Sequence, residues 1–298
     1  MNTIRQQQGA SWLDYLKSWP HYALPQHAIS RLTYRLTRIQ TAWFKNAFIR
    51  WFAQHFQVNW SEALYPRPED YRHFNAFFTR PLRDGARPIE GDGNTVISPA
   101  DGHISQIGTI DRDAVFQAKG HEFSVTDLLG GDTQRAALFR DGSFMTVYLS
   151  PRDYHRVHMP LSGKLRETIY IPGRLFSVAP HTTRTIPRLF ARNERLVSIF
   201  ETDAGAMAVV LVGAINVAAI ETVWSGLVTP PPRPGIEVEN CQQSAIELER
   251  GAEMGRFNMG STVILLFGKD QIRWLQGLQA GQALQMGQQL GKKTLGEP

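Results

Sequence analysis

The sequence predicts an α+β protein, in which a β-rich core with a sandwich or barrel-like sheet follows an amphipathic helical region at the N-terminus. Up to about residue 60, apolar side chains recur at three- and four-residue steps, the period of a helix with one apolar face. From Thr95 onward, short β-branched and aromatic runs alternate with Gly, Pro and Asp, as in strands joined by turns. The 298 residues suffice for one large domain or two modest ones.

The helical pattern runs from Ser30 to Phe56 and predicts one helix or two. Its apolar stripe consists of Leu32, Leu36, Ile39, Trp43, Ala47 and Trp51. Arginine and lysine fill much of the remaining surface, so the segment suits a lipid interface with aromatic side chains at headgroup depth. The alternative is a helix that packs on the protein's own core and exposes a basic face to water.

The charge distribution supports an anionic partner for this region. Residues 1–60 hold seven basic side chains, one acidic side chain and five of the seven tryptophans, whereas the whole chain has a net charge of only +5. Basic charge interleaved with aromatics suits an anionic membrane surface or a nucleic acid. No apolar run is long enough to predict a spanning helix, and the N-terminus has no signal-peptide core. We therefore expect residues 1–62 to be a membrane-association region that precedes a second domain over residues 63–298.

The second domain begins with a connecting region. Residues 61–94 contain four prolines, and within them residues 71–78 predict a short helical turn that caps the core with its aromatics. The strands are expected near Thr95–Ser98, His103–Ile110, Ala114–Gln117, Phe144–Leu149, Lys164–Tyr170, Leu196–Glu201, Ala206–Val212, Asn216–Trp224, Ala245–Glu249 and Thr262–Phe267. The single cysteine, Cys241, excludes an intramolecular disulfide and suits a reducing compartment.

The segment before the last predicted strand permits an unusual reaction. Ser261 follows Gly260, and glycine lets a neighbouring hydroxyl approach its carbonyl closely. Attack of the Ser261 hydroxyl on the Gly260 carbonyl would turn the peptide bond into an ester. Elimination would then cut the chain and leave a pyruvoyl group at position 261. A Gly-Ser-Thr sequence is also ordinary turn chemistry, so the segment alone does not decide between the two.

Two further segments contain candidate catalytic side chains. Asp101 lies in a Pro-Ala-Asp-Gly turn, and His155 and His158 lie between two prolines. An aspartate, a histidine and a serine can form an activated nucleophile, in which the carboxylate orients the imidazole that takes the hydroxyl proton. Each residue alone could equally be structural. No HExxH motif or cysteine cluster is present, so no metal site is predicted.

Several long motifs, in this order, resemble the phosphatidylserine decarboxylase family. They are FNAFFTRPLR (74–83), SPADGHIS (98–105), YLSPRDYHRVHMP (148–160), LFARNERLVSIF (189–200), GAINVAAIETVW (213–224) and GRFNMGSTVILLF (255–267). The likeness covers most of the chain from about residue 60. Met259 stands where the family usually has leucine, a substitution of similar volume from which we expect little effect.

The resemblance implies a bacterial-type zymogen that cleaves itself between Gly260 and Ser261. The products would be a β chain, 1–260, and an α chain, 261–298, whose pyruvoyl group derives from Ser261. Asp101 and His158 match the family residues that activate the serine, and His155 matches the histidine implicated in protonation during decarboxylation. Tyr148 and Ser177 are similar to residues that line the head-group pocket.

The implied reaction converts phosphatidylserine to phosphatidylethanolamine and CO₂ through a Schiff base, a step of phospholipid biosynthesis. The implied partners are phosphatidylserine and anionic membrane lipid, with the α and β chains paired and two such pairs associated. The implied location is peripheral, on the cytoplasmic face of the inner membrane, without nucleic acid. The alternatives are a lipid-acting serine hydrolase with an intact chain, a pyruvoyl decarboxylase for a soluble amino acid, and a non-catalytic membrane or nucleic-acid adaptor.

Overall fold

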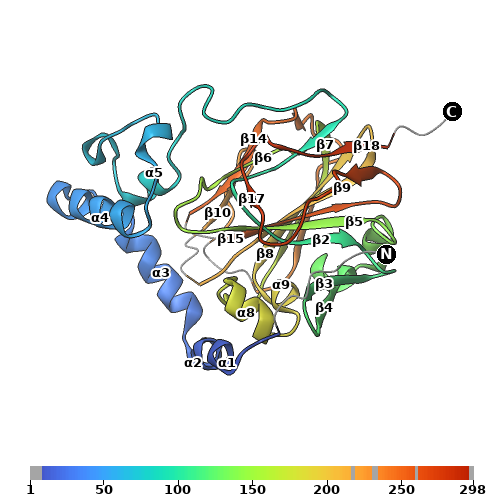
Figure 1. Ribbon diagram of the computed structural model, residues 1–298, viewed down its shortest axis with the longest axis horizontal. Coiled ribbons are helices and arrows are strands. Elements are labelled where there is room, and N and C mark those ends of the chain that lie inside the picture. Colours follow the sequence, from blue (N-terminus) through green and yellow to red (C-terminus); the bar gives the residue numbers. More distant parts are fainter. Residues whose placement is uncertain (1–8, 216–218, 230–233, 259–260, 295–298) are drawn as a thin grey trace.

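The computed structural model describes residues 9–215, 219–229, 234–258 and 261–294, and for Ser261 it describes the backbone (Figure 1). The helices are α1 (Trp12–Ser18), α2 (Pro20–Ala23), α3 (Gln26–Leu36), α4 (Ala42–His55), α5 (Phe74–Phe78), α6 (Val125–Leu128), α7 (Thr133–Ala137), α8 (Pro180–Thr185) and α9 (Leu189–Arg192), with 3-10 turns η1 (Trp60–Glu62) and η2 (Pro68–Asp70).

The strands are β1 (Thr95–Ile97), β2 (Gly102–Thr109), β3 (Ala114–Ala118), β4 (His121–Ser124), β5 (Ser143–Leu149), β6 (Arg156–His158), β7 (Gly163–Ile171), β8 (Arg195–Thr202), β9 (Gly205–Val212), β10 (Ile220–Thr222), β11 (Gly226–Leu227), β12 (Glu237–Asn240), β13 (Glu247–Leu248), β14 (Glu253–Phe257), β15 (Ser261–Phe267), β16 (Ile272–Trp274), β17 (Ala283–Leu284) and β18 (Gln289–Lys293). The predicted mixed α+β class with a strand-rich core is confirmed.

The N-terminal arm, defined here as α1 to α4, lies along one side of the sheets (Figure 1). The predicted helical segment forms two helices, α3 and α4. Ile49 and Phe52 of α4 pack with Phe74 and Phe77 of α5 in a small buried cluster of their own. The aromatics of residues 71–78 therefore pack mainly on α4 rather than cap the sheet core, because α4 presents a complementary apolar face to them. Among the described helices, none is long and apolar enough to cross a bilayer.

The main core surrounds an antiparallel sheet of nine strands. Along its path the order is β12-β7-β8-β9-β15-β5-β2-β17, and β13 pairs with β7 beside β12. Strand β15 lies between β9 and β5, and Val263 to Phe267 are all inaccessible to solvent. Burial on both faces explains why this strand is a continuous apolar run rather than an alternating one.

A second antiparallel sheet, β11-β10-β14-β6, contains the segment that leads to residue 260. Strands β6 and β14 were not predicted, because they are short and their exposed positions are charged. Arg156 of β6 donates to Glu253 of β14 at 2.8 Å, and Arg256 of β14 contacts Glu253 at 3.0 Å. A strand was expected over Asn216–Trp224. Residues 216–218 lie outside the described residues, and the observed strand β10 covers Ile220–Thr222. Two small sheets, β1-β18-β16 and β3-β4, complete the fold.

Candidate active site

The segment proposed for cleavage joins the two larger sheets. Strand β14 ends at Phe257, and the backbone N–H of Asn258 donates to the Ala219 carbonyl at 2.8 Å. Met259 and Gly260 lie outside the described residues. Ser261 begins β15, where its backbone pairs with Leu149 at the end of β5. Ser261 is therefore placed at the start of the central strand and next to the connection that contains His155 and leads into β6, which ends at His158.

His158 is held at both ring nitrogens. Its Nδ1 lies 2.8 Å from the Gly251 carbonyl, and its Nε2 lies 3.1 Å from the Tyr154 hydroxyl. A carbonyl can only accept, so Nδ1 bears the hydrogen of the neutral ring and Nε2 presents its lone pair. Burial lowers the pKa of His158, although the bond with Gly251 and the charge of nearby carboxylates oppose this. The imidazole is therefore a neutral base whose Nε2 can accept a proton.

Asp101 is buried at the turn before β2 and is bonded to other groups. Both of its oxygens accept from the buried Arg87 guanidinium, whose Nε lies 2.8 Å from Oδ1, and Oδ1 also accepts from the Met286 N–H at 2.9 Å. Arg87 additionally donates to Glu62 at 2.9 Å. The backbone brings Asp101 and His158 near each other, since the His158 N–H donates to the Pro99 carbonyl at 2.8 Å. No hydrogen bond joins Asp101 to the His158 ring among the described residues; Gly251 and Tyr154 orient the ring.

Gly102 allows the Asp101 turn to lie against β5. A Cβ at this position would stand 2.3 Å from the Tyr148 carbonyl oxygen, closer than any side chain tolerates. Only glycine therefore permits β2 to begin here, in register with Tyr148. Gly102 is therefore required for packing against β5 as well as for the Pro-Ala-Asp-Gly turn.

His155 is fully buried with one ring nitrogen unpartnered. Its Nδ1 lies 2.8 Å from the Asp153 carbonyl, and its ring packs on Phe78 with centroids 4.0 Å apart. Nε2 is buried and has no hydrogen-bond partner among the described residues. Burial lowers the pKa of His155 to about 3; the bond to Asp153 opposes the shift and the charge of Arg80 adds to it. A buried ring nitrogen without a hydrogen-bond partner suits a side chain that exchanges a proton with a bound ligand.

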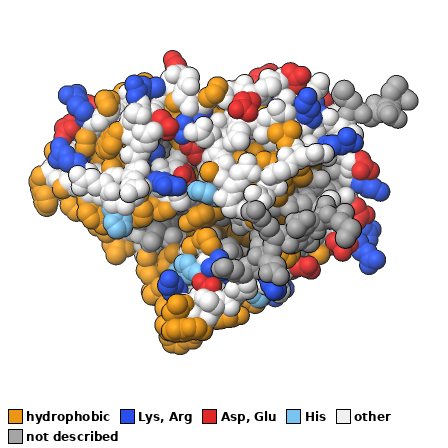
Figure 2. Space-filling model, in the orientation of Figure 1, with side chains coloured by type: hydrophobic (Ala, Val, Ile, Leu, Met, Phe, Trp, Pro, Cys, Tyr) orange, Lys and Arg blue, Asp and Glu red, His pale blue; other side chains and the backbone are white. Residues whose placement is uncertain are grey.

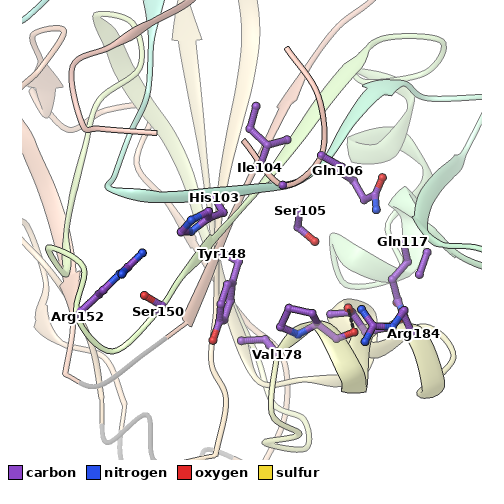
Figure 3. Close-up of a pocket in the computed structure, with 15 residues that line it drawn as sticks. His103, Ile104, Ser105, Gln106, Gln117, Tyr148, Ser150, Arg152, Val178 and Arg184 are labelled. Carbon is purple, nitrogen blue, oxygen red and sulfur yellow. Dashed lines mark hydrogen bonds between the residues drawn. The ribbon is translucent and has the colours of Figure 1, made fainter. Parts of the chain in front are cut away.

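A cavity of about 660 Å³ lies beside this region (Figure 3). Tyr148 lines it, and burial raises the pKa of the Tyr148 hydroxyl. Ser177 is adjacent to Val178, which lines the cavity, and its Oγ accepts from the Ala179 N–H at 3.3 Å. Ser150 and Arg152, in the connection after β5, line the same cavity. The cavity thus contains one of the two predicted head-group residues and borders the other.

The surroundings of residue 261 fit a covalent carbonyl group at that position. Strand β15 is hydrogen-bonded on both sides, so the residue that begins it would be held in place after a break before it. The orphan Nε2 of His155 lies in the connection that leaves β5 at the Ser261 partner Leu149. Sequence reasoning missed Tyr154 and Arg87. Tyr154 belongs to a recognised motif, but the buried bonds of Arg87 had no signal in the sequence.

Comparisons with known proteins give a consistent result. The family model described as phosphatidylserine decarboxylase matches residues 74–292, and a second model, described as PSD, matches residues 16–57.

The chain is also similar to curated proteins called phosphatidylserine decarboxylase proenzyme. It is 56% identical to that of Pseudomonas fluorescens strain Pf0-1 over 275 residues, which cover 92% of this chain and 96% of the relative. It is 55% identical to that of Stutzerimonas stutzeri strain A1501 over 276 residues, 92% of this chain and 93% of the relative. The relative from Azotobacter vinelandii strain DJ is 55% identical over 276 residues, 92% of this chain and 96% of its own. The chain therefore belongs to the phosphatidylserine decarboxylase family.

Proposed function

We propose that this chain is made as a proenzyme that cleaves itself between Gly260 and Ser261 and then decarboxylates phosphatidylserine to phosphatidylethanolamine. The observation that supports this most directly is the position of Ser261 at the start of the buried central strand, beside the connection that contains His155 and leads into β6, which ends at His158. The family membership and the word proenzyme in the relatives' names agree with it.

Self-cleavage uses the neutral form of His158. Its Nε2 takes the proton of the Ser261 hydroxyl, and the freed oxygen attacks the Gly260 carbonyl, which replaces the peptide bond with an ester. Asp101 stabilises the protonated ring by its negative charge, and Gly251 keeps the tautomer fixed. Elimination releases the Gly260 carboxylate, and hydrolysis of the resulting dehydroalanine gives the pyruvoyl group and ammonia.

In the mature enzyme, the pyruvoyl carbonyl supplies the electron-withdrawing group that decarboxylation of an amino acid needs. The chain's own residues bind the substrate and move protons. Tyr148 contacts the head group from the cavity wall, Ser177 contacts it from the position next to the lining residue Val178, and β15 fixes the position of residue 261. Nε2 of His155, which carries no proton while Nδ1 donates to Asp153, takes a proton from the substrate's ammonium group and then delivers it to the carbon that loses CO₂; the burial of the ring excludes competing water.

The N-terminal arm gives access to the substrate's membrane. Residues 1–62 form the membrane-association region, and residues 63–298 form the decarboxylase domain. Large apolar side chains on the arm are exposed, among them Trp12 and Trp19 at 72% and Trp43 at 75%. Figure 2 shows hydrophobic side chains along the edge of the molecule where the arm lies. Exposed tryptophans beside basic residues suit the headgroup layer of an anionic bilayer.

We place the enzyme peripherally on the cytoplasmic face of the inner membrane, which suits its free, buried Cys241. The α and β chains form a tight pair, because β15 is paired on both sides with β-chain strands. The association of two such pairs stays a prediction, which sedimentation in detergent would test. No observation favours the lipid-acting serine hydrolase.

Intact-mass measurement of the purified protein tests the proposal. Wild type should give two polypeptides separated at 260/261, with a mass at residue 261 that matches pyruvoyl, and should release CO₂ from phosphatidylserine. Ser261→Ala should give a single full-length polypeptide without activity. Cleavage of that variant at the same bond, or an unbroken wild-type chain that is active, would refute the proposal.

A further inference from the structure

The cavity beside the candidate site has the charge expected for an anionic ligand. Among the described residues, its lining contains two arginines, Arg152 and Arg184, and no aspartate or glutamate. Figure 3 shows Arg152 and Arg184 at opposite sides of the cavity, with Tyr148 between them. Its volume of about 660 Å³ accommodates a polar head group with part of its attached chain.

The two ends of the cavity differ in their surroundings. Tyr148 and Ser150 flank Leu149, the backbone partner of Ser261, so their end is the reacting end. Arg184 belongs to α8, which contacts α1 through a hydrogen bond of 2.7 Å between Thr185 and Ser18. The end at Arg184 is therefore adjacent to the arm that we place on the membrane.

Arg184 is held by a carboxylate from α1. Its Nε lies 3.2 Å from Oδ2 of Asp14, and its Nη2 lies 3.0 Å from Oδ1. This forked pairing, which uses two nitrogens and two oxygens, is the geometry in which a guanidinium also binds two oxygens of a phosphate. The Arg184 side chain is 34% exposed, so a phosphate can reach it.

The position of α1 explains how a lipid would come to this arginine. The helix turns Asp14 toward α8, whereas Trp12, Leu16 and Trp19 are exposed. If the exposed side chains enter the headgroup layer, the ion pair lies at the depth of the lipid phosphates. Asp14 also accepts from the Ser11 N–H at 3.0 Å, so its carboxylate keeps a hydrogen bond when a phosphate takes its place at Arg184.

We propose that Arg184 binds the phosphodiester of the lipid substrate at the membrane end of the cavity, and that Asp14 is the counter-ion that Arg184 holds when no lipid is bound. The inference rests on the proposed function, since it names a binding residue for the same substrate. The phosphate then lies at Arg184, and the amine and carboxylate of the head group extend toward Tyr148.

Kinetics of the matured full-length enzyme on soluble dihexanoyl phosphatidylserine test this proposal. Arg184→Gln should raise KM about tenfold, the loss of roughly one charge-assisted hydrogen bond, with kcat changed less than twofold. Asp14→Asn should lower KM, because it removes the competing carboxylate. The opposite signs of the two changes in KM are decisive. If the ion pair were merely structural, either substitution would break it and KM would change in the same direction.

The matched control is Arg188→Gln. Arg188 lies four residues after Arg184, its side chain is 63% exposed, and it contacts Asp127 at 3.5 Å. This variant should leave KM unchanged. Equal shifts of KM in the same direction for Arg184→Gln and Asp14→Asn, or no shift for Arg184→Gln, would overturn the proposal.

Binding of dihexanoyl phosphatidylglycerol, measured by calorimetry, separates this inference from the proposed function. That lipid has the phosphodiester without the amine and carboxylate, so its binding should weaken in Arg184→Gln and strengthen in Asp14→Asn whether or not the enzyme turns over phosphatidylserine. A wild type that binds in this way but does not decarboxylate phosphatidylserine would refute the function alone. Inorganic phosphate is the second probe: if it binds as tightly as the lipid, Arg184 is a site for free phosphate and the proposal fails.

Discussion

Nδ2 of Asn75 donates to Oδ1 of Asn258 over 2.6 Å, between two buried side chains. Asn75 lies in α5, and its backbone N–H donates to the Thr37 carbonyl at the end of α3, at 2.9 Å. Asn258 is two residues before Gly260. A continuous path of hydrogen bonds therefore joins the N-terminal arm to the segment that contains the proposed cleavage bond.

We expect this hydrogen bond to set the rate of self-cleavage. Asn75→Ala leaves the buried Asn258 amide oxygen without its donor, which costs about 1–3 kcal/mol and loosens the approach to residue 260. The half-time of cleavage in freshly synthesised protein should lengthen for Asn75→Ala, for Asn258→Ala and for the double variant, with the double variant no slower than the slower single one. The control is Asn46→Ala on α4, whose amide donates to Glu69 and accepts from Lys45. Simple additivity of the two effects would exclude a shared role.

Substitution of His158 and of His155 should block different stages, self-cleavage in the first case and decarboxylation in the second. His158→Ala removes the base and should leave the full-length chain uncut. His155→Ala should still cleave but decarboxylate at least a hundredfold more slowly, because general acid catalysis contributes on the order of 10²-fold or more. Gel analysis of cleavage and CO₂ release from the same preparations measure both stages. Equal maturation defects in the two variants would contradict this division.

The burial of His155 should make the fold acid-sensitive. Its pKa is about 3 in the folded protein and near 6.5 when exposed, so between these values the unfolded chain binds a proton that the folded chain excludes. Stability should therefore decline as the pH falls below 6.5, by up to about 1.4 kcal/mol per pH unit from this group. Urea unfolding of the uncleaved Ser261→Ala protein measures this slope. Adding His155→Phe should reduce this slope, with the remainder due in part to His158, whereas adding His55→Gln at an exposed position should not change it.

Membrane binding should depend on the exposed tryptophans of the arm. Replacement of Trp12, Trp19 and Trp43 by serine should lower the fraction that floats with liposomes containing acidic lipid, while self-cleavage continues. Deletion of residues 1–58 should have at least the same effect on flotation. The control is Trp224→Ser, because Trp224 lies outside the arm. Unchanged flotation of the triple variant would remove these side chains from the membrane proposal.

The sequence predicted the elements whose apolar pattern is set by burial. Strands β2, β5, β7, β8, β9 and β15 were expected within a residue or two of their observed bounds, because each contributes buried apolar side chains to the main core, in a continuous run in β15 and in alternation in β2. Strands β16 to β18 were not predicted. They are short and rich in polar residues, and their pairing with β1 and β2 depends on contacts far away in the sequence.

The candidate site was predictable as far as recognisable motifs extend. Those motifs named Asp101, His155, His158 and Ser261, but they could not show that Arg87 occupies the Asp101 carboxylate or that Gly251 orients His158. Such partners are backbone carbonyls and buried side chains 14 to 93 residues away, and no local pattern specifies them. The same holds for the pairing of Arg184 with Asp14 across 170 positions.

The position of β15 between β9 and β5 affects whether thermal unfolding of the cleaved enzyme can be reversed. After the proposed cleavage, the middle of the largest sheet would be supplied by a separate polypeptide of 38 residues. Once this polypeptide dissociates, recovery becomes a bimolecular event that depends on dilution, and the original peptide bond cannot be restored. We therefore expect the rate of unfolding, rather than an equilibrium, to set the lifetime of the cleaved enzyme, whereas the uncut chain can refold from its own unfolded state.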